Sequence, residues 1–378
     1  MEKNIPLFDL KKQYALLRED IRQAFDEVLD SQVMIGGPFI NRLEDAVASY
    51  CGVSSAVALS SGTDALLAAL MALGIYRSPL DSANAGEVIL PSFTFFATAG
   101  CVWRAGAVPV FADIDEDTFN ISIESLESKI TKNTKAIIPV HLFGQCANME
   151  AIKAIADKHG IPVIEDCAQS IGAVRNGKKS GAFGICGALS FFPTKNLGGF
   201  GDGGMIVSND SAYADKVRVV RNHGMDPKYF HKSVGGNFRL DALQAAGLLV
   251  KLAHLDAWHD ARRRNAAFYN EAFAGCEKIK TPKIDSANTS IYNQYVVRVP
   301  ERDKCIEFLR ANGVGCEIYY PLPLHLQECF APLGGKIGDC PVSEAVAKDC
   351  LALPIFPELE RAELERSAEV LNKFAASL

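Results

Sequence analysis

The sequence has 378 residues, more than one hydrophobic core normally supports, and this length predicts two domains. Hydrophobic residues make up 48% and charged residues 22%, the ordinary mixture of a globular protein in water. The net charge of −6 argues against a nucleic-acid partner, which favours a clustered basic face, so a small-molecule substrate is the better expectation.

Short apolar runs alternate with helical spacing between about residues 55 and 210. This alternation indicates an α/β domain with a largely parallel sheet, and uniformly apolar runs indicate strands covered on both faces. The expected strands are residues 56–59, 88–90, 108–111, 136–140, 163–165, 188–192 and 205–208. The expected helices are residues 64–73, 94–105, 149–159 and 212–221. A polar stretch at 77–85 predicts an exposed loop.

Beyond about residue 240 the pattern changes to that of a smaller α+β domain. A long helical pattern at residues 240–273 is expected to bridge the two parts. It is followed by strand-like residues 292–299, a helix near 303–311, strand-like residues 315–320 and a final helix at 361–376.

The chain shows no pattern typical of export, membrane insertion or metal binding. Its first residues, MEKNIPLFDLKKQY, carry charges where a signal peptide is apolar, and the apolar residues 65–75 are too few to span a bilayer. The 11 cysteines form no CxxC pair, so neither a disulfide framework nor a zinc site is predicted. We expect a cytoplasmic protein, with His141 and His223 in structural roles.

Lys195 lies where a predicted strand passes into a loop, a position that suits a catalytic residue. It follows an apolar run and precedes a glycine-dense stretch in SFFPTKNLGGFGDGG. A lysine beside glycines is by itself a common feature of surface loops. Two further segments make a catalytic role the better interpretation.

The first segment is VIEDCAQ, in which Asp166 ends a buried strand. An unpaired carboxylate in that setting is costly, so it needs a partner. The protonated pyridine nitrogen of pyridoxal phosphate is one such partner, because this ion pair keeps the ring an electron sink. Capping of the following helix is the alternative. Both interpretations place Asp166 at the rim where α/β proteins bind ligands.

The second segment is LSSGTDA, in which Ser61, Gly62 and Thr63 separate a strand from a helix. Free backbone N–H groups and hydroxyls at a helix N-terminus form an anion site. An ordinary N-cap is equally compatible with the residues. Together the three segments supply an anion cradle, a buried acid and a lysine on one rim of the sheet.

Five long motifs resemble those of the DegT/DnrJ/StrS family of sugar aminotransferases: GTDAL, PSFTFFATA, IEDCAQSIGA, SFFPTKNLGGFGDGG and NFRLDALQAA. The similarity runs from IPLFDL to YYPLPLH. It implies an α/β fold of type I, with a large domain (1–250) containing a mostly parallel seven-stranded sheet flanked by helices. A smaller C-terminal α+β domain (251–378) is expected to follow. The implied cofactor is pyridoxal 5'-phosphate, with pyridoxamine 5'-phosphate as the intermediate form.

The family's cofactor-binding residues carry over position by position. Lys195 matches the Schiff-base lysine, and Asp166 matches the partner of the pyridine nitrogen. Gln169 resembles the side chain near the ring's phenolic oxygen, and Phe95 takes the place of the aromatic residue that stacks on the ring. The residues that match the phosphate cradle are Ser61, Gly62, Thr63 and Ser190.

Other matching positions concern a partner subunit and the substrate. Asn237 matches an asparagine that reaches the cofactor phosphate of the neighbouring subunit, which implies a homodimer with shared active sites. Arg239, Tyr320 and His325 are candidate substrate contacts. Their alternatives are a helix-start ion pair, a half-buried strand tyrosine and an ordinary loop histidine.

The resemblance implies a two-step transfer of an amino group, expected to come from L-glutamate, to a nucleotide-linked keto sugar. Lysine suits this reaction because its amine is a nucleophile and, with a lowered pKa, a general base. Relatives with histidine at this position perform dehydration, so Lys195 favours transamination.

The expected site of amination is C3, because NFRLDALQAA is closer to enzymes that act there. A UDP-2-acetamido-3-keto-glucuronic acid and a dTDP-3-keto-6-deoxyhexose are both candidate acceptors. The alternatives are a 4-keto aminotransferase, a lyase on the same fold, and a non-enzymatic regulatory member of the family.

Overall fold

The computed structural model of the protein describes residues 4–78, 80, 83 and 85–378. Two sheets meet where Ile137 and Val140 bridge in parallel to Val163 and Asp166, which gives seven described strands in the order β3-β2-β4-β5-β8-β9-β1. In that described sheet only β9 runs antiparallel to its neighbours. The strands are β1 (Ser55–Leu59), β2 (Glu87–Pro91), β3 (Val108–Ala112), β4 (Thr134–Ile137), β5 (Ile164–Asp166), β8 (Cys186–Ser190) and β9 (Gly204–Ser208).

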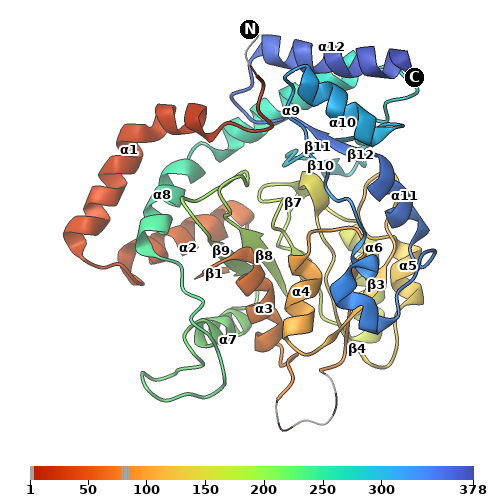
Figure 1. Ribbon diagram of the computed structural model, residues 1–378. Coiled ribbons are helices and arrows are strands. Elements are labelled where there is room, and N and C mark those ends of the chain that lie inside the picture. Colours follow the sequence, from red (N-terminus) through yellow and green to blue (C-terminus); the bar gives the residue numbers. More distant parts are fainter. Residues whose placement is uncertain (1–3, 79, 81–82, 84) are drawn as a thin grey trace.

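Helices cover both faces of this sheet, as the uniformly apolar strands predict (Figure 1). One face packs against α3 (Gly62–Ala72), α4 (Ala97–Arg104) and α7 (Ser211–Arg221). The other face packs against α2 (Gly37–Cys51), α5 (Ile123–Ser128), α6 (Met149–His159) and α8 (Ala242–Leu252). The expected α/β class with a mostly parallel, helix-flanked sheet of seven strands is confirmed.

A second core forms from the C-terminal part of the chain together with Ile5 near the N-terminus. Ile5 joins it through a parallel bridge to Val314. The elements around this core are α9 (Leu255–Ala272), β11 (Tyr295–Arg298), α10 (Arg302–Ala311), β12 (Cys350–Leu353) and α12 (Arg361–Ser377). Strands β11 and β12 pair antiparallel. Helix α1 (Leu10–Ser31) lies away from this core and packs along α8 (Figure 1).

Two expectations about the C-terminal part are wrong. The helix expected at 240–273 is two helices, because the chain turns at Ala253 and His254, where the N–H of His254 bonds to the carbonyl of Lys251. The strand expected at 315–320 is reduced to one bridge between Glu317 and Ala352.

The sequence patterns also missed several elements. These are α1, α2, α5, α11 (Pro341–Asp349), β12, the two-residue strands β6 (Val174–Arg175), β7 (Lys178–Lys179) and β10 (Asn288–Thr289), and the 3₁₀ turns η1 (Leu142–Gly144), η2 (Leu324–Leu326) and η3 (Glu328–Leu333).

The loop expected at 77–85 lies partly outside the described residues. Its two ends are fixed beside α4, because the N–H of Arg77 bonds to the carbonyl of Ala105 and the N–H of Ala85 bonds to that of Gly106.

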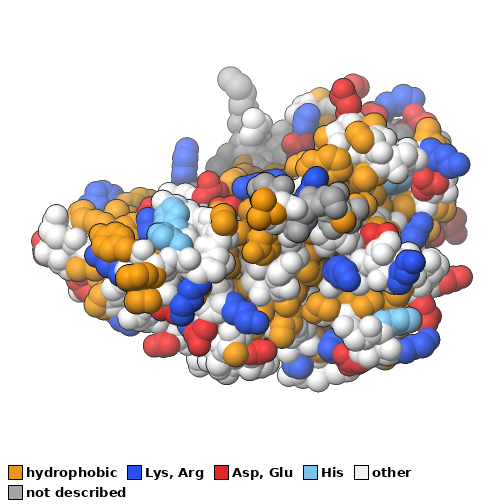
Figure 2. Space-filling view, turned by 90° about the horizontal axis from the view of Figure 1, so that it is seen from below, with side chains coloured by type: hydrophobic (Ala, Val, Ile, Leu, Met, Phe, Trp, Pro, Cys, Tyr) orange, Lys and Arg blue, Asp and Glu red, His pale blue; other side chains and the backbone are white. Residues whose placement is uncertain are grey.

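On the face seen from below in Figure 2, Lys and Arg side chains are interspersed with acidic and hydrophobic ones and form no continuous basic face. Among the described helices, none is long and apolar enough to cross a membrane.

Candidate active site

A cavity of about 430 Å³ opens at the carboxyl ends of β5 and β8. This is the rim where sheets of this kind bind ligands. Nine of the residues singled out from the sequence line it: Ser61, Gly62, Thr63, Phe95, Asp166, Gln169, Ser190, Lys195 and Tyr320. The fold thus brings together segments that are up to 259 positions apart in the chain (320 minus 61).

Asp166 is held rigidly at the end of β5. Its Oδ2 accepts a hydrogen bond from the Thr98 hydroxyl at 2.8 Å, and its Oδ1 accepts one from the Ala168 N–H at 3.1 Å. The single Thr98 proton is used in this way, so the Thr94 hydroxyl, 3.2 Å away, is the donor to Thr98. Burial raises the pKa of Asp166 despite these bonds. A cation in contact with this carboxylate would offset that cost.

Lys195 faces the same cavity from a tightly folded loop after β8. Its N–H bonds to the carbonyl of Phe192 at 2.8 Å. A Cβ on Gly198 would lie 2.1 Å from the carbonyl oxygen of Pro193, so only glycine fits at this turn. Burial lowers the pKa of Lys195 from 10.5 to about 8, although the carboxylate of Asp166 acts in the opposite direction. The result is an amine that can gain and lose a proton near neutral pH.

The start of α3 can hold an anion. The Ser61 hydroxyl caps the helix by accepting a hydrogen bond from the N–H of Asp64 at 3.0 Å. The N–H groups of Gly62 and Thr63 lie in the first turn, where a helix offers no internal acceptor. A Cβ on Gly62 would lie 2.8 Å from the Cβ of Ser190, so glycine lets the helix start approach the end of β8 closely. Capping and anion binding are therefore compatible at this helix.

Gln169, Phe95 and Tyr320 form a further part of the cavity lining. The Oε1 of Gln169 accepts a hydrogen bond from the Phe143 N–H at 2.8 Å, and its Nε2 donates to the Tyr320 hydroxyl at 3.0 Å. Phe95 is 56% exposed, and its ring centroid lies 6.2 Å from that of Tyr320. An aromatic ring so exposed inside a cavity provides a surface for another flat group.

Behind Asp166, a buried acid fixes the end of β5. Glu165 accepts hydrogen bonds from the N–H groups of Gly181, Phe183 and Gly184 and from the Nε2 of His141 at 2.8 Å. The Nδ1 of His141 accepts a hydrogen bond from a backbone N–H. Both ring nitrogens of His141 are thus used within the protein, which suits a structural role.

Three predicted site residues lie outside this cavity in the described chain. His325 is buried, with its Nδ1 2.6 Å from the Ser92 hydroxyl and its Nε2 3.2 Å from Glu344. The side chain of Asn237 is exposed near the surface, where its backbone bridges to Asn222.

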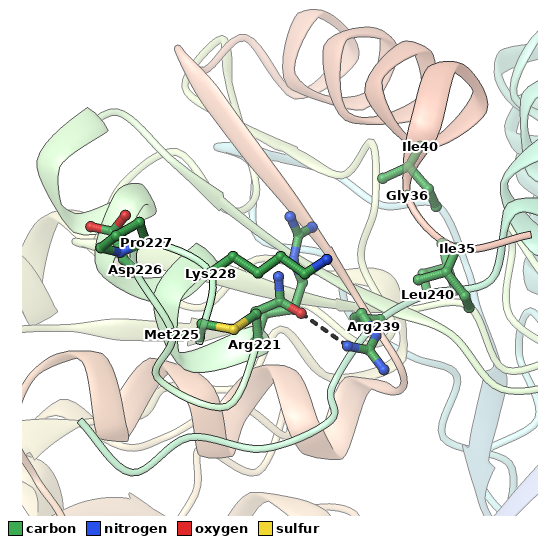
Figure 3. A pocket seen from close by; sticks show the side chains of 11 residues that line it. Ile35, Gly36, Ile40, Arg221, Met225, Asp226, Pro227, Lys228, Arg239 and Leu240 are labelled. Atoms are coloured by element: carbon green, nitrogen blue, oxygen red, sulfur yellow. Dashed lines mark hydrogen bonds between the residues drawn. The ribbon is translucent and has the colours of Figure 1, made fainter. Parts of the chain in front are cut away.

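Arg239 lines a second pocket of about 510 Å³ (Figure 3). Arg221 and Lys228 lie in the same pocket. The Nη1 of Arg239 donates to Asn222 at 3.0 Å, while its buried Nε has no partner among the described residues.

Several residues of the main cavity were missed by the sequence patterns. Asp202 lines the cavity, and Thr98 supports Asp166 from behind it; both lie within motifs already quoted, but their residue types gave no separate signal. Gln294 lies in the strand-like run at 292–299, directly after the polar Asn293, and its residue type gave no separate signal.

The donors and acceptors of this cavity suit pyridoxal phosphate. Its phosphate fits the N–H groups of Gly62 and Thr63, its pyridine nitrogen fits the buried carboxylate of Asp166, and its aldehyde fits the amine of Lys195. The exposed face of Phe95 provides a surface for the ring.

Known proteins are similar to this chain over nearly its whole length. The chain is 48% identical to a pleiotropic regulatory protein of Geobacillus stearothermophilus over 98% of this chain and 100% of that one. It is 44% identical to a UDP-N-acetyl-3-dehydro-alpha-D-glucosamine 3-aminotransferase of Acidithiobacillus ferrooxidans, over 98% and 97% of the two chains. The crystal structure of S. venezuelae DesV in complex with a ketimine intermediate superimposes with a TM-score of 0.95 at 38% identity, covering 99% of each chain.

The family model for DegT/DnrJ/EryC1/StrS aminotransferases matches residues 15–372. The protein is an enzyme, a pyridoxal-phosphate-dependent transaminase. The chain belongs to the DegT/DnrJ/EryC1/StrS aminotransferase family.

Proposed function

We propose that the enzyme transfers the amino group of L-glutamate to the C3 ketone of a nucleotide-linked sugar, with Lys195 as its catalytic residue. The observation that carries this proposal is the pairing of Lys195, whose pKa burial lowers to about 8, with the buried Asp166 across one cavity. The name of the Acidithiobacillus relative, a 3-aminotransferase of a UDP-linked 3-keto sugar, supports amination at C3.

The residues that line the cavity have different roles in the proposed reaction. Bound pyridoxal phosphate supplies the electron sink that makes the proton on the amino-bearing carbon labile. Lys195 lines the cavity, and its amine would remove this proton as a base and return a proton as an acid. Asp166 would keep the ring nitrogen protonated. Gln169, fixed by Phe143, would orient the ring through its oxygen substituent.

The lowered pKa of Lys195 leads to a prediction about cofactor uptake. Only the neutral amine reacts with the aldehyde of pyridoxal phosphate, and the neutral fraction grows as pH rises to the pKa of about 8. The rate of covalent uptake by the apoenzyme should therefore rise roughly tenfold per pH unit up to about pH 8 and then level off. Stopped-flow absorbance measures this rate. A rate that continues to climb to about pH 10, as for free lysine, would contradict the lowered pKa.

The charge of the cavity supports a homodimer with shared active sites. Among the described residues that line it, Lys195 is the single cation and stands against the carboxylates of Asp166 and Asp202. A cofactor phosphate and a nucleotide diphosphate would add further negative charge. The second pocket is lined by Arg221, Lys228 and Arg239 against the carboxylate of Asp226, so its described lining has a net positive charge. We propose that a partner subunit presents its Asn237 and Arg239 to this cavity.

A cytoplasmic location is part of the same proposal. All 11 cysteines are free thiols, as a reducing compartment maintains.

A panel of keto sugars tests the substrate. The enzyme receives L-glutamate with UDP-2-acetamido-3-keto-glucuronic acid, UDP-N-acetyl-3-keto-glucosamine, a dTDP-3-keto-6-deoxyhexose and the matching 4-keto sugars. We expect kcat/KM for one 3-keto sugar to exceed that for any 4-keto sugar by about 100-fold. Higher turnover of a 4-keto sugar would show that the 4-keto alternative is right. No turnover of any sugar, with the cofactor bound, would favour a regulatory role such as the name of the Geobacillus relative indicates.

A further inference from the structure

Gln294 has an unsatisfied polar atom at the wall of the main cavity. It lines this cavity together with Thr194, Lys195 and Tyr319, and it also borders two smaller pockets. Its Oε1 is buried and has no hydrogen-bond partner among the described residues. A buried amide oxygen without a partner is costly, and at a cavity wall it indicates that a bound molecule supplies the missing donor.

The backbone that leads to Gln294 is fixed by hydrogen bonds of the residues before it. The N–H groups of Ile291 and Asn293 bond to the carbonyls of Gly144 and Phe143. The guanidinium of Arg262 donates to the carbonyl of Asn293 at 3.3 Å. The Asn293 side chain donates to Asn196, the residue after Lys195, at 2.7 Å. The last bond ties the segment directly to the lysine loop.

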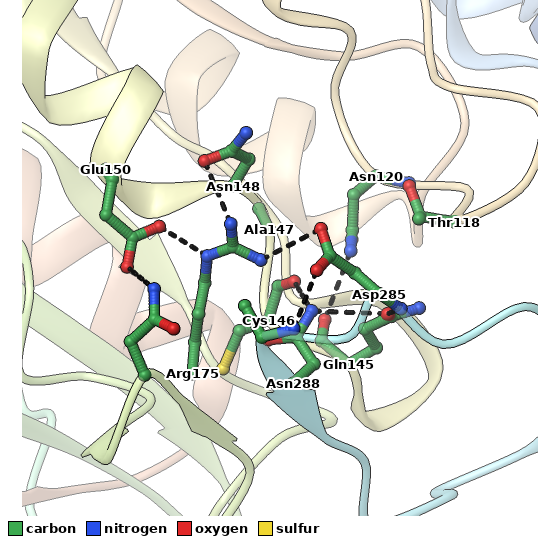
Figure 4. A network of polar contacts seen from close by, with 12 residues as sticks. Thr118, Asn120, Gln145, Cys146, Ala147, Asn148, Glu150, Arg175, Asp285 and Asn288 are labelled. Atoms are coloured by element: carbon green, nitrogen blue, oxygen red, sulfur yellow. Dashed lines mark hydrogen bonds and ion pairs between the residues drawn. The ribbon is translucent and has the colours of Figure 1, made fainter.

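The chain leading to Gln294 is anchored further back by a polar network (Figure 4). Asn288 donates to the carbonyl of Cys146 at 2.9 Å and to the Oε1 of Gln145 at 3.2 Å. Asp285 forms an ion pair with the buried Arg175 at 3.2 Å. The segment from 285 to 293 is therefore held against the large sheet domain at both ends, and Gln294 projects from it as a preset contact.

The chemistry of the two substrates decides which of them Gln294 meets. The amide oxygen accepts hydrogen bonds, and the carboxylates of glutamate also only accept. The ammonium of glutamate is the group that reacts beside Lys195. A sugar, by contrast, carries hydroxyl groups, and a 2-acetamido sugar also carries an amide N–H, all of which donate.

From this complementarity we propose that Gln294 is a specificity residue that binds a hydroxyl or amide N–H of the sugar and contributes little to the reaction with glutamate. The proposal rests on the function proposed above.

The reaction that starts from the pyridoxal form of the enzyme measures the effect of a substitution on each substrate separately. Both L-glutamate and the amino sugar UDP-2-acetamido-3-amino-2,3-dideoxy-glucose convert this form to the pyridoxamine form, which absorbance follows. For Gln294→Leu we expect kcat/KM with the amino sugar to fall about 10- to 100-fold, and kcat/KM with glutamate to change less than about threefold. The Kd of the amino sugar for the apoenzyme, measured by calorimetry, should rise by about tenfold or more.

Two further variants exclude a general loss of structure. Gln294→Glu keeps an acceptor oxygen, so it should recover most of the reaction with the amino sugar, while its charge slows the reaction with glutamate. Gln23→Leu, the same kind of change at an exposed position of α1, should leave both reactions unchanged.

The outcomes separate this proposal from the one on which it rests. Equal losses with both substrates in Gln294→Leu, or no loss with either, would overturn the role of Gln294 while the proposed function stands. A wild-type enzyme that reacts with glutamate but neither with this amino sugar nor with any keto sugar of the panel would overturn both.

Discussion

Replacing Lys195 with alanine should reduce transamination by about 10⁴-fold or more, because one side chain both holds the cofactor and moves the proton. Its amine faces the cavity, and its pKa, lowered by burial to about 8, suits both tasks. Lys195→Arg should be similarly inactive, since a guanidinium keeps the charge but does not give up its proton. The measurement is formation of the amino sugar from L-glutamate under steady-state conditions.

Lys251 offers a matched control for this prediction. Burial lowers its pKa to about 8 as well, but its ammonium donates to the carbonyl of Gly198 at 2.7 Å and does not line the cavity. Lys251→Met should therefore lower the melting temperature while the folded enzyme keeps kcat within about fivefold. A Lys195→Ala enzyme that retains a tenth of wild-type turnover would show that another group transfers the proton.

The Lys195→Ala variant also tests the proposal that two subunits share the active site. Lys195→Ala and Arg239→Ala subunits, each inactive alone, are unfolded together and refolded as a mixture. If the partner's Arg239 completes the cavity, half of the random dimers contain one intact site, and about a quarter of wild-type activity should return. A mixture as inactive as its parents would contradict the proposal that the partner's Arg239 completes the cavity.

Much of the fold was predictable because its signals are local. Apolar runs of four to five residues mark strands with both faces covered, and the runs around Val57, Ile89 and Ile206 became β1, β2 and β9. The end of the bridging helix was not predictable in this way. Apolar spacing continues across Ala253 and His254, and the break there shows only in the backbone, where the N–H of His254 bonds to the carbonyl of Lys251.

The residues of the candidate site differ in the same way, because some have a local signal in the sequence and others do not. Lys195, Asp166 and the Gly62 segment were found because each stands at a strand end, where the residue type itself has a chemical meaning. Gln294 was missed because the proposal for it depends on the lack of a partner for its buried oxygen, and this lack is visible only in the folded structure. The positions of Arg239 and His325 outside the cavity likewise depend on packing between distant segments.

Replacing Asp166 with asparagine should lower kcat by about 10²- to 10³-fold and weaken cofactor binding. The amide has nearly the shape of the carboxylate but cannot hold a proton on the ring nitrogen. The contacts from Thr98 and Ala168 fix the side chain, so the loss follows from charge and not from displacement. Cofactor affinity is measured by fluorescence quenching and kcat by amino-sugar formation. Thr98→Val, which keeps the carboxylate, should cost much less.

A second measurement separates this electrostatic role from a loss of structure. The carboxylate of Asp166 raises the pKa of Lys195, against the larger effect of burial. Its removal should therefore lower that pKa below about 8, so cofactor uptake by the Asp166→Asn apoenzyme should level off at a more acidic pH than in the wild type. Asp166→Glu, which keeps the charge, should leave this pH close to the wild-type value. If cofactor uptake levels off at the same pH in Asp166→Asn and in the wild type, the carboxylate does not act on the pKa of Lys195. Asp166 then has only a structural role with respect to the lysine.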